Sequence, residues 1–64
     1  MNQETIEGNW NILKGKLKET YGELTDDDLR EMEGRTDRAI GIIQRRTGLA
    51  RQEIQRRLDE LARE

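Results

Sequence analysis

The sequence lacks several residue types on which enzyme chemistry commonly depends. Its 64 residues include no Cys, His, Pro or Phe, and neither Ser nor Val occurs. Without Cys and His, the chain cannot supply disulfides, thiol nucleophiles, imidazole general bases or the usual zinc ligands. Without Ser, the common pairing of a hydroxyl nucleophile with a base cannot be assembled. These absences predict a protein that is not an enzyme and has no catalytic residues, cofactor or metal site.

Apolar residues are also scarce. They make up 31% of the chain, with one Trp and one Tyr, and no apolar run is longer than two residues. This pattern predicts neither a secretory signal nor a membrane span, and the expected location is cytoplasmic. So short a chain buries only about 60% of the surface that it exposes when unfolded. We therefore expect marginal stability, no pocket of useful size and no small-molecule substrate.

Charged residues are abundant and unevenly placed. They form 41% of the sequence, with 12 basic and 14 acidic side chains and a net charge of −2. Residues 1–33 hold four basic and nine acidic groups, whereas residues 34–64 hold eight basic and five acidic groups. A nucleic-acid-binding domain is normally basic overall and rich in aromatic residues. Solvated helix faces are thus the simpler interpretation, and weak contact with nucleic acid or another anionic surface is the alternative.

Helical periodicity occurs in four segments. The first carries Ile6, Trp10, Leu13, Leu17 and Tyr21 on one stripe. A capping box formed by Thr25 and Asp28 is expected to start the second segment. The predicted helices are 5–21, 26–33, 35–47 and 50–62. They indicate an all-α fold in a single domain, 1–64, with four short helices arranged as two crossed helical hairpins in a compact bundle.

Two sets of glycines repeat along the chain. The first set is Gly8, Gly15 and Gly22, and the second is Gly34, Gly41 and Gly48. Within each set the glycines are seven residues apart, and the second set lies 26 residues after the first. This repeat suggests two related hairpins. Gly22 and Gly48 are expected to end helices in the left-handed conformation. Because the glycines lie opposite the apolar stripes, three interpretations stay open: solvent-facing or capping positions, a second close-packed face, or local weakening at Gly15 and Gly41.

A partner surface could form from isolated apolar residues or from the arginines of the C-terminal half. Ile12 lies opposite the Trp10 stripe and Ile42 lies at the edge of its own stripe, so together they could form a small contact patch. The candidate surface comprises Ile12, Ile42, Arg45, Arg46, Arg56 and Arg57. The alternatives are ordinary scattered apolar residues and arginines paired with nearby carboxylates. Helix capping explains the acidic run 26–28 better than a metal loop does.

An ordered set of short motifs resembles one family. It consists of Asn9-Trp10, Lys14-Gly15-Lys16, Tyr21-Gly22, Leu24-Thr25-Asp26-Asp27-Asp28, Glu33-Gly34, Asp37, Gly41, Ile43-Gln44 and Gly48. On these motifs the chain resembles the CsbD-like family of small bacterial general stress-response proteins. It departs from the family pattern at Tyr21, where Trp is usual, at Ile42, where Lys is expected, and at Ala50, where a capping Ser or Thr is usual.

The resemblance implies a compact four-helix fold, induction by general stress and abundant accumulation in the cytoplasm. It implies no catalytic residue. The functional hypothesis is a non-enzymatic bacterial stress-response protein that acts by abundance as a soluble, hydrophilic protectant. The alternative is a small helical interaction module that binds a protein partner or, less favoured, nucleic acid through its arginine-rich C-terminal half.

Overall fold

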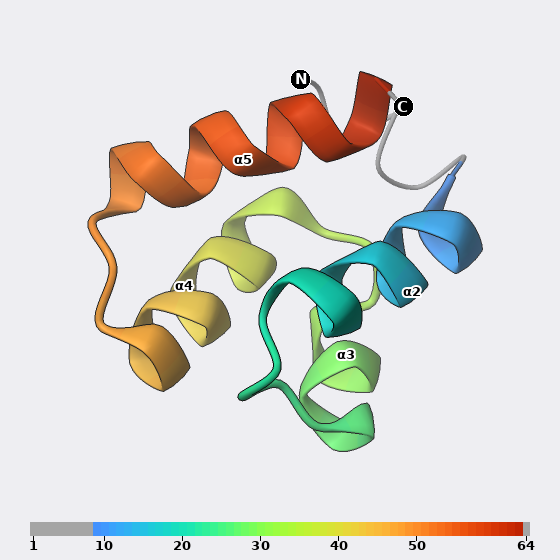
Figure 1. Ribbon diagram of the computed structural model, residues 1–64. Coiled ribbons are helices and arrows are strands. Elements are labelled where there is room, and N and C mark those ends of the chain that lie inside the picture. Colours follow the sequence, from blue (N-terminus) through green and yellow to red (C-terminus); the bar gives the residue numbers. More distant parts are fainter. Residues whose placement is uncertain (1–8, 64) are drawn as a thin grey trace.

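A computed structural model describes residues 9–63 of the protein. This stretch contains four helices and no strand: α2 (Trp10–Thr20), α3 (Asp26–Met32), α4 (Thr36–Thr47) and α5 (Arg51–Arg63) (Figure 1). The all-α class and the four helices predicted from the sequence are confirmed.

The predicted bounds agree with the last three helices to within one residue at each end. The first helix differs, because α2 begins at Trp10 with Asn9 as its N-cap rather than at residue 5. Ile6 and Gly8, which the prediction placed at the start of this segment, lie outside the described residues.

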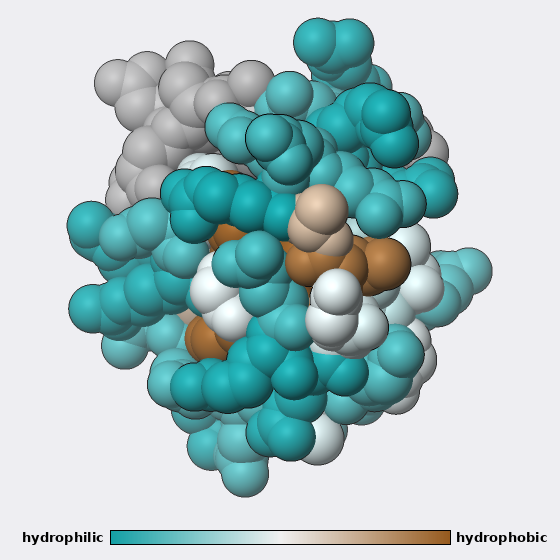
Figure 2. Space-filling model, turned by 90° about the vertical axis from the view of Figure 1, so that its left-hand side faces the viewer, coloured by the Kyte–Doolittle hydropathy of each residue, from teal (hydrophilic) through white to brown (hydrophobic). Residues whose placement is uncertain are grey.

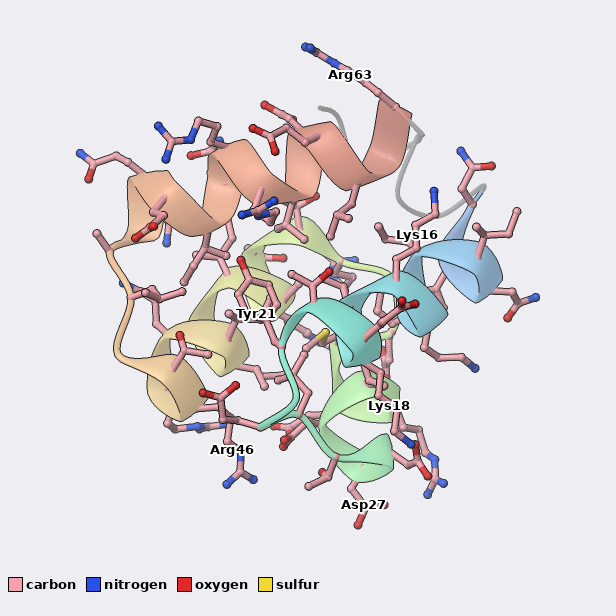
Figure 3. The ribbon with its side chains drawn as sticks, viewed as in Figure 1. Lys16, Lys18, Tyr21, Asp27, Arg46 and Arg63 are labelled. Carbon is pink, nitrogen blue, oxygen red and sulfur yellow. The ribbon has the colours of Figure 1, made fainter. Side chains whose placement is uncertain are left out.

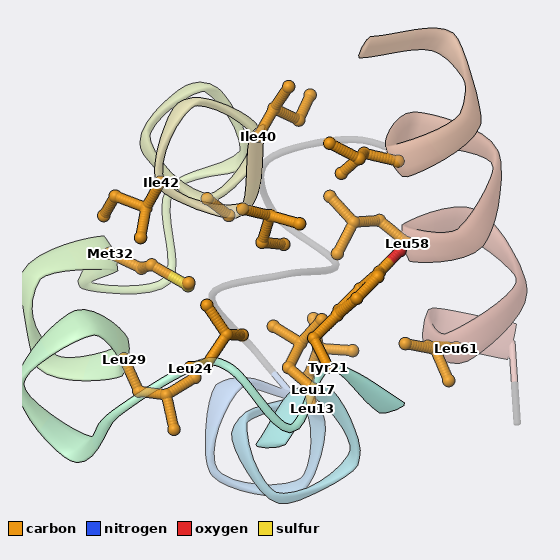
Figure 4. Close-up of a cluster of buried hydrophobic side chains, with 13 residues drawn as sticks. Leu13, Leu17, Tyr21, Leu24, Leu29, Met32, Ile40, Ile42, Leu58 and Leu61 are labelled. Carbon is orange, nitrogen blue, oxygen red and sulfur yellow. The ribbon is translucent and has the colours of Figure 1, made fainter. Parts of the chain in front are cut away.

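The four helices enclose one apolar cluster. In Figure 4 the view runs down α2 and α4, which lie on opposite sides of the cluster, while α3 and α5 close the other two sides. Trp10 and Leu49 are partly buried against it. The buried members are Leu13, Leu17, Tyr21, Leu24, Leu29, Met32, Ala39, Ile40, Ile42, Ile43, Ile54, Leu58 and Leu61. The cluster draws on every helix, so no hairpin has a separate core.

Helix α4 is the central packing element. Its most extensive contacts are with α3 on one side and α5 on the other, and α2 packs mainly on α5. Helices α3 and α4 run antiparallel, since Asp28 in the first turn of α3 meets Arg46 in the last turn of α4. The C-terminal part of α5 also lies beside the start of α2, where Ile12 and Leu61 line one hollow.

The turn between α3 and α4 is left-handed at two successive residues, which the sequence did not predict. Glu33 has φ 54° and Gly34 has φ 74°. A Cβ atom on Gly34 would lie 3.4 Å from Cγ of Trp10. Gly34 is favoured here by its positive φ, and a Cβ at this position would be in ordinary van der Waals contact with the indole. The Trp10 indole at the start of α2 thus lies beside the α3–α4 turn.

The glycines predicted to end helices behave differently from one another. Gly48 ends α4 with φ 75°, and its N–H bonds to the carbonyl of Gln44, as predicted. Gly22 does not adopt a left-handed conformation; instead Tyr21 is the C-cap of α2, with φ −117°. The prediction for Gly22 is wrong because α2 already ends at Tyr21, whose N–H bonds to the carbonyl of Leu17 at 2.8 Å without a left-handed residue.

A second close-packed glycine face does not occur in the described residues. A Cβ built on Gly15, Gly22, Gly41 or Gly48 would meet no atom within 4 Å. All four positions therefore leave open space and require no close approach, and Gly48 differs from the other three only in its positive φ.

Candidate interaction surface

The two isoleucines of the predicted patch occupy different environments. Ile12 is 63% exposed on α2, whereas Ile42 is only 5% exposed and belongs to the core. The two residues also line different hollows. The prediction of an exposed patch formed by Ile12 and Ile42 is therefore wrong.

The burial of Ile42 follows from the packing of α4. A helix that meets one neighbour buries a single stripe, but α4 packs against both α3 and α5 and so buries a wider arc. Ile40 and Ile43 contribute to this arc as well, each at most 1% exposed. Apolar Ile42, which stands where the family resemblance led us to expect Lys, thus enlarges the core.

Arg46 is held within the protein by Asp28. Its Nε donates to Oδ2 of Asp28 at 2.9 Å and its Nη2 donates to Oδ1 at 3.0 Å, a bidentate geometry that favours strong pairing. Figure 3 shows Arg46 beside the segment that leads into α3. The side chain of Asp28 is 4% exposed, whereas that of Arg46 is 46% exposed. Arg46 is therefore engaged with its own chain and is poorly placed to recruit a partner.

Asp28 also completes the predicted capping box. Its N–H donates to Oγ1 of Thr25 at 3.1 Å, and the Thr25 N–H donates to Oδ2 of Asp28 at 3.0 Å. The hydrogen bonds from Arg46, followed by the one from the Thr25 backbone, lower the pKa of Asp28 from its usual 3.8. The Asp28 carboxylate thus caps the N-terminus of α3 and also binds Arg46 in the last turn of α4.

Further ion pairs link α3 and its flanking residues to the rest of the chain. Lys18 of α2 meets Asp26 at 2.6 Å and lowers the pKa of that carboxyl, mainly by its hydrogen bond. Arg38 of α4 meets Glu33 at 2.8 Å. Both pairs are largely exposed, so each contributes little stability by itself. Together with the Asp28–Arg46 pair they connect this acidic segment to α2 and α4.

Arg57 faces the buried phenol of Tyr21. Burial raises the pKa of Tyr21, while the charge of Arg57 and its hydrogen bond to the phenol oppose that rise. Arg57 also approaches Glu60, with 3.5 Å between Nη1 and Oε2. Like Arg46, Arg57 therefore has partners inside the protein, which agrees with the alternative that these arginines pair with nearby carboxylates.

Two arginines of the candidate surface remain without an ion pair to other described residues. Both Arg45 and Arg56 are exposed, on α4 and α5. Arg45 lines an open hollow of about 500 Å³ together with Glu31, Arg38, Gly41 and Ile42. Gly41 contributes no side chain to the wall of this hollow. The hollow is wide open, unlike the enclosed sites that bury a small ligand.

Lys16 connects α2 to α5. Its Nζ donates to the backbone carbonyl of Leu61 at 3.3 Å, within the last turn of α5, where helix carbonyls lack partners from their own helix. The motif Lys14-Gly15-Lys16 contributes this contact. Sequence periodicity alone could not find it, since 45 residues separate donor and acceptor.

Neither a metal-binding cluster nor a membrane-spanning helix occurs among residues 9–63. Within residues 9–63 no three acidic side chains are grouped so that they could hold a metal ion. None of the four described helices has the length and apolar character that crossing a membrane requires. The face in Figure 2 is mostly hydrophilic, with small, separate apolar areas. Such a surface can make weak polar contacts, but it lacks the broad apolar area of a stable interface.

Comparison with known proteins identifies bacterial relatives along nearly the whole chain. The protein is 44% identical over 62 residues to a UPF0337 protein of Nitrosomonas europaea, an alignment that covers 97% of this chain and 66% of the relative. It is 42% identical over 59 residues to the UPF0337 protein YjbJ of Escherichia coli, covering 92% and 86% of the two chains. A UPF0337 protein of Bordetella pertussis is 43% identical over 60 residues, covering 94% and 91%.

The chain thus spans just under two thirds of the Nitrosomonas relative and most of the other two. No solved structure matches the protein. The family model described as CsbD-like matches residues 4–56, which include α2, α3, α4 and the first half of α5. The motifs that the sequence carries, the four-helix fold and these relatives agree, and the chain belongs to the CsbD-like family.

Proposed function

We propose that this protein is a non-enzymatic, cytoplasmic general stress-response protein that acts by abundance as a hydrophilic protectant. The observation that carries the proposal is the match to the CsbD-like family over residues 4–56. The surface supports it as well. Among the described residues, Ile12 is the only large apolar side chain that is exposed. A charged surface without apolar patches tolerates a high protein concentration with little non-specific association.

The proposal is tested by drying, heating or osmotically stressing cells with and without the gene, and by drying a labile enzyme with purified protein. Protection is expected to rise gradually with the mass of protein added, without saturating at a fixed ratio. Loss of the gene should reduce survival or increase aggregation under at least one of these stresses. Unchanged survival and aggregation under all of them would contradict the protective role.

A matched pair of variants determines whether the folded state is needed. Leu58→Ala removes buried core contacts, whereas Ile12→Ala changes an exposed residue and leaves the core intact. If the folded surface protects, the Leu58→Ala variant should protect less under conditions where it is unfolded. Equal protection by both variants would assign the effect to composition alone.

One observation favours the alternative of an interaction module. Arg45 and Arg56 are exposed and make no ion pair with other described residues, so they are available to an anionic partner. Contact with nucleic acid or an acidic protein should then weaken steeply as salt is added. Saturable capture of one partner, lost in Arg56→Glu, would support this function over the protectant function.

A further inference from the structure

Three short ion pairs join α3 or its C-cap to other helices. Their nitrogen and oxygen atoms lie 2.6–2.9 Å apart, and the pairs are Lys18–Asp26, Arg38–Glu33 and Arg46–Asp28. We call them the α3 ion pairs. They connect the first turn of α3 to α2 and to the end of α4, and its C-cap to the start of α4. Figure 3 shows Lys18 extending from α2 towards α3.

Longer ion pairs lie within a single helix or beside its N-cap. Their atoms are 3.4–3.8 Å apart, and the pairs are Arg30–Asp27, Arg35–Asp37 and Arg57–Glu60. These pairs cannot hold one helix against another. The shortest charge contacts thus support α3, which with seven residues is also the shortest of the described helices.

Two of the α3 ion pairs are surrounded by water in dilute solution. All four side chains of Lys18–Asp26 and Arg38–Glu33 are exposed, so each pair contributes little stability there. The attraction between two charges varies inversely with the dielectric constant of their surroundings. A fall in its effective value from about 80 to about 20 strengthens the attraction about fourfold. Removal of water therefore strengthens these contacts.

The apolar side chains of α3 respond to drying in the opposite sense. Leu29 and Met32 are buried in the apolar cluster, and their burial is favourable because it removes apolar surface from water. This driving force declines as water leaves. Helix α3 thus has two kinds of support, apolar burial and ion pairs, which change in opposite directions as the protein dries.

Repulsion within the acidic run 26–28 is offset by nearby cations. Drying strengthens repulsion between like charges as well, but each of these three carboxylates has a basic partner, and the partners are Lys18, Arg30 and Arg46. The run also forms the first turn of α3, where the helix dipole favours negative charge. The attraction therefore dominates around this helix.

We propose that the α3 ion pairs hold α3 in place more firmly as water is removed, and that they keep the protein folded in the dry state. The inference rests on the proposed protectant function, because a protectant that acts during drying works at low water content. It goes beyond that function by assigning the stability of the dry state to particular charges.

Two double variants with the same change in charge provide the experiment. Asp26→Asn with Glu33→Gln removes both exposed α3 ion pairs, whereas Asp27→Asn with Asp37→Asn removes two of the longer pairs and is the control. Both take the net charge from −2 to 0, and both remove one carboxylate from the first turn of α3. Asp28 is left unchanged because it also forms the capping box.

The full chain and both variants are dried as films at stepwise lower humidity, and their helix content is followed by circular dichroism and infrared absorption. In dilute buffer the two variants should have similar thermal midpoints. On drying, Asp26→Asn with Glu33→Gln should lose helix at a higher humidity than the control variant and the original protein.

Three results would overturn the proposal: loss of helix by the original protein on drying, equal behaviour of the two variants in the films, or a difference between them that is already as large in dilute buffer. The measurement follows the helix content of this chain alone. Failure to protect a second enzyme would count against the protectant function and would leave this result unchanged, so the two failures are distinguishable.

Discussion

Helices α3 and α5 flank the same core, yet they are held in different ways. Helix α3 has seven residues, too few to be stable as an isolated helix. It has a complete capping box, and ion pairs from both α2 and α4 reach it. Helix α5 has thirteen residues, no cap side chain at Ala50, and a regular apolar stripe of Ile54, Leu58 and Leu61, all buried.

The difference shows how a small, hydrophilic chain distributes its stabilising interactions. A long helix gains enough buried apolar area to compensate for a poor start, because each fully buried Leu or Ile contributes about 1.5–3 kcal/mol. A short helix buries less, and here two of its side chains, Leu29 and Met32, enter the apolar cluster. Polar contacts at its two ends therefore matter more for α3 than for α5.

The largest effect is expected from Leu58→Ala on α5. Leu58 is completely buried, and truncation of such a residue costs about 2–5 kcal/mol. In a domain this small the loss should remove most or all of the cooperative transition in a urea denaturation followed by circular dichroism. Ile12→Ala, on the exposed face of α2, is the control and should change the midpoint only slightly. A stable Leu58→Ala variant would show that apolar packing does not hold α5.

Asp28→Asn should have the next largest effect, on α3. The change removes the charge that Arg46 pairs with and weakens the acceptor for the Thr25 N–H. Asp27→Asn is the matched control, because Asp27 lies in the same first turn but points into solvent (Figure 3). The thermal midpoint should fall clearly for Asp28→Asn and little for Asp27→Asn. Equal shifts in the two variants would mean that helix-dipole charge alone supports α3.

Acid should release the same contacts in the unchanged protein. The pKa of Asp28 is lowered in the folded state, so the unfolded state binds more protons at pH values between the folded and unfolded pKa. The stabilising contribution is thus complete above the usual pKa of 3.8 and is lost as pH falls through the lowered value. Urea midpoints measured from pH 6 downwards should decrease over this range. Asp28→Asn should decrease less, and parallel curves for the two proteins would contradict this assignment.

The N-caps of α3 and α5 can be changed in opposite directions, and the expected effects on stability are smaller. Thr25→Ala removes a cap that α3 has, and should lower the free energy of unfolding by about 0.5–2 kcal/mol. Ala50→Ser adds a cap that α5 lacks, opposite Glu53 in its first turn, and should raise that free energy by a similar amount. Chemical denaturation of both variants measures the pair. No change in Ala50→Ser would mean that its hydroxyl does not reach the first turn of α5.

Features determined by neighbouring residues could be predicted from the sequence, whereas features that join distant residues could not. The Thr25–Asp28 capping box and the end of α4 at Gly48 depend on a few adjacent positions, and both are confirmed. The Asp28–Arg46 pair joins residues 18 apart, so periodicity gave no indication of it. Of the candidate surface, Arg46 is therefore paired with Asp28 and Ile42 is buried in the core, while Arg45 remains exposed.

Glycine replacements distinguish the turn that ends α3 from an ordinary helix position. Gly34→Ala should destabilise the protein, because its φ is 74° and the left-handed conformation costs about 1–2 kcal/mol for other residues. Gly15→Ala on α2 meets open space and should stabilise the helix by about 1 kcal/mol. The two variants add the same methyl group, so denaturation midpoints that move in opposite directions would attribute the difference to the backbone conformation at Gly34. If both midpoints rose, the α3–α4 turn would be free to relax, and the ion pairs around α3 would be its main support.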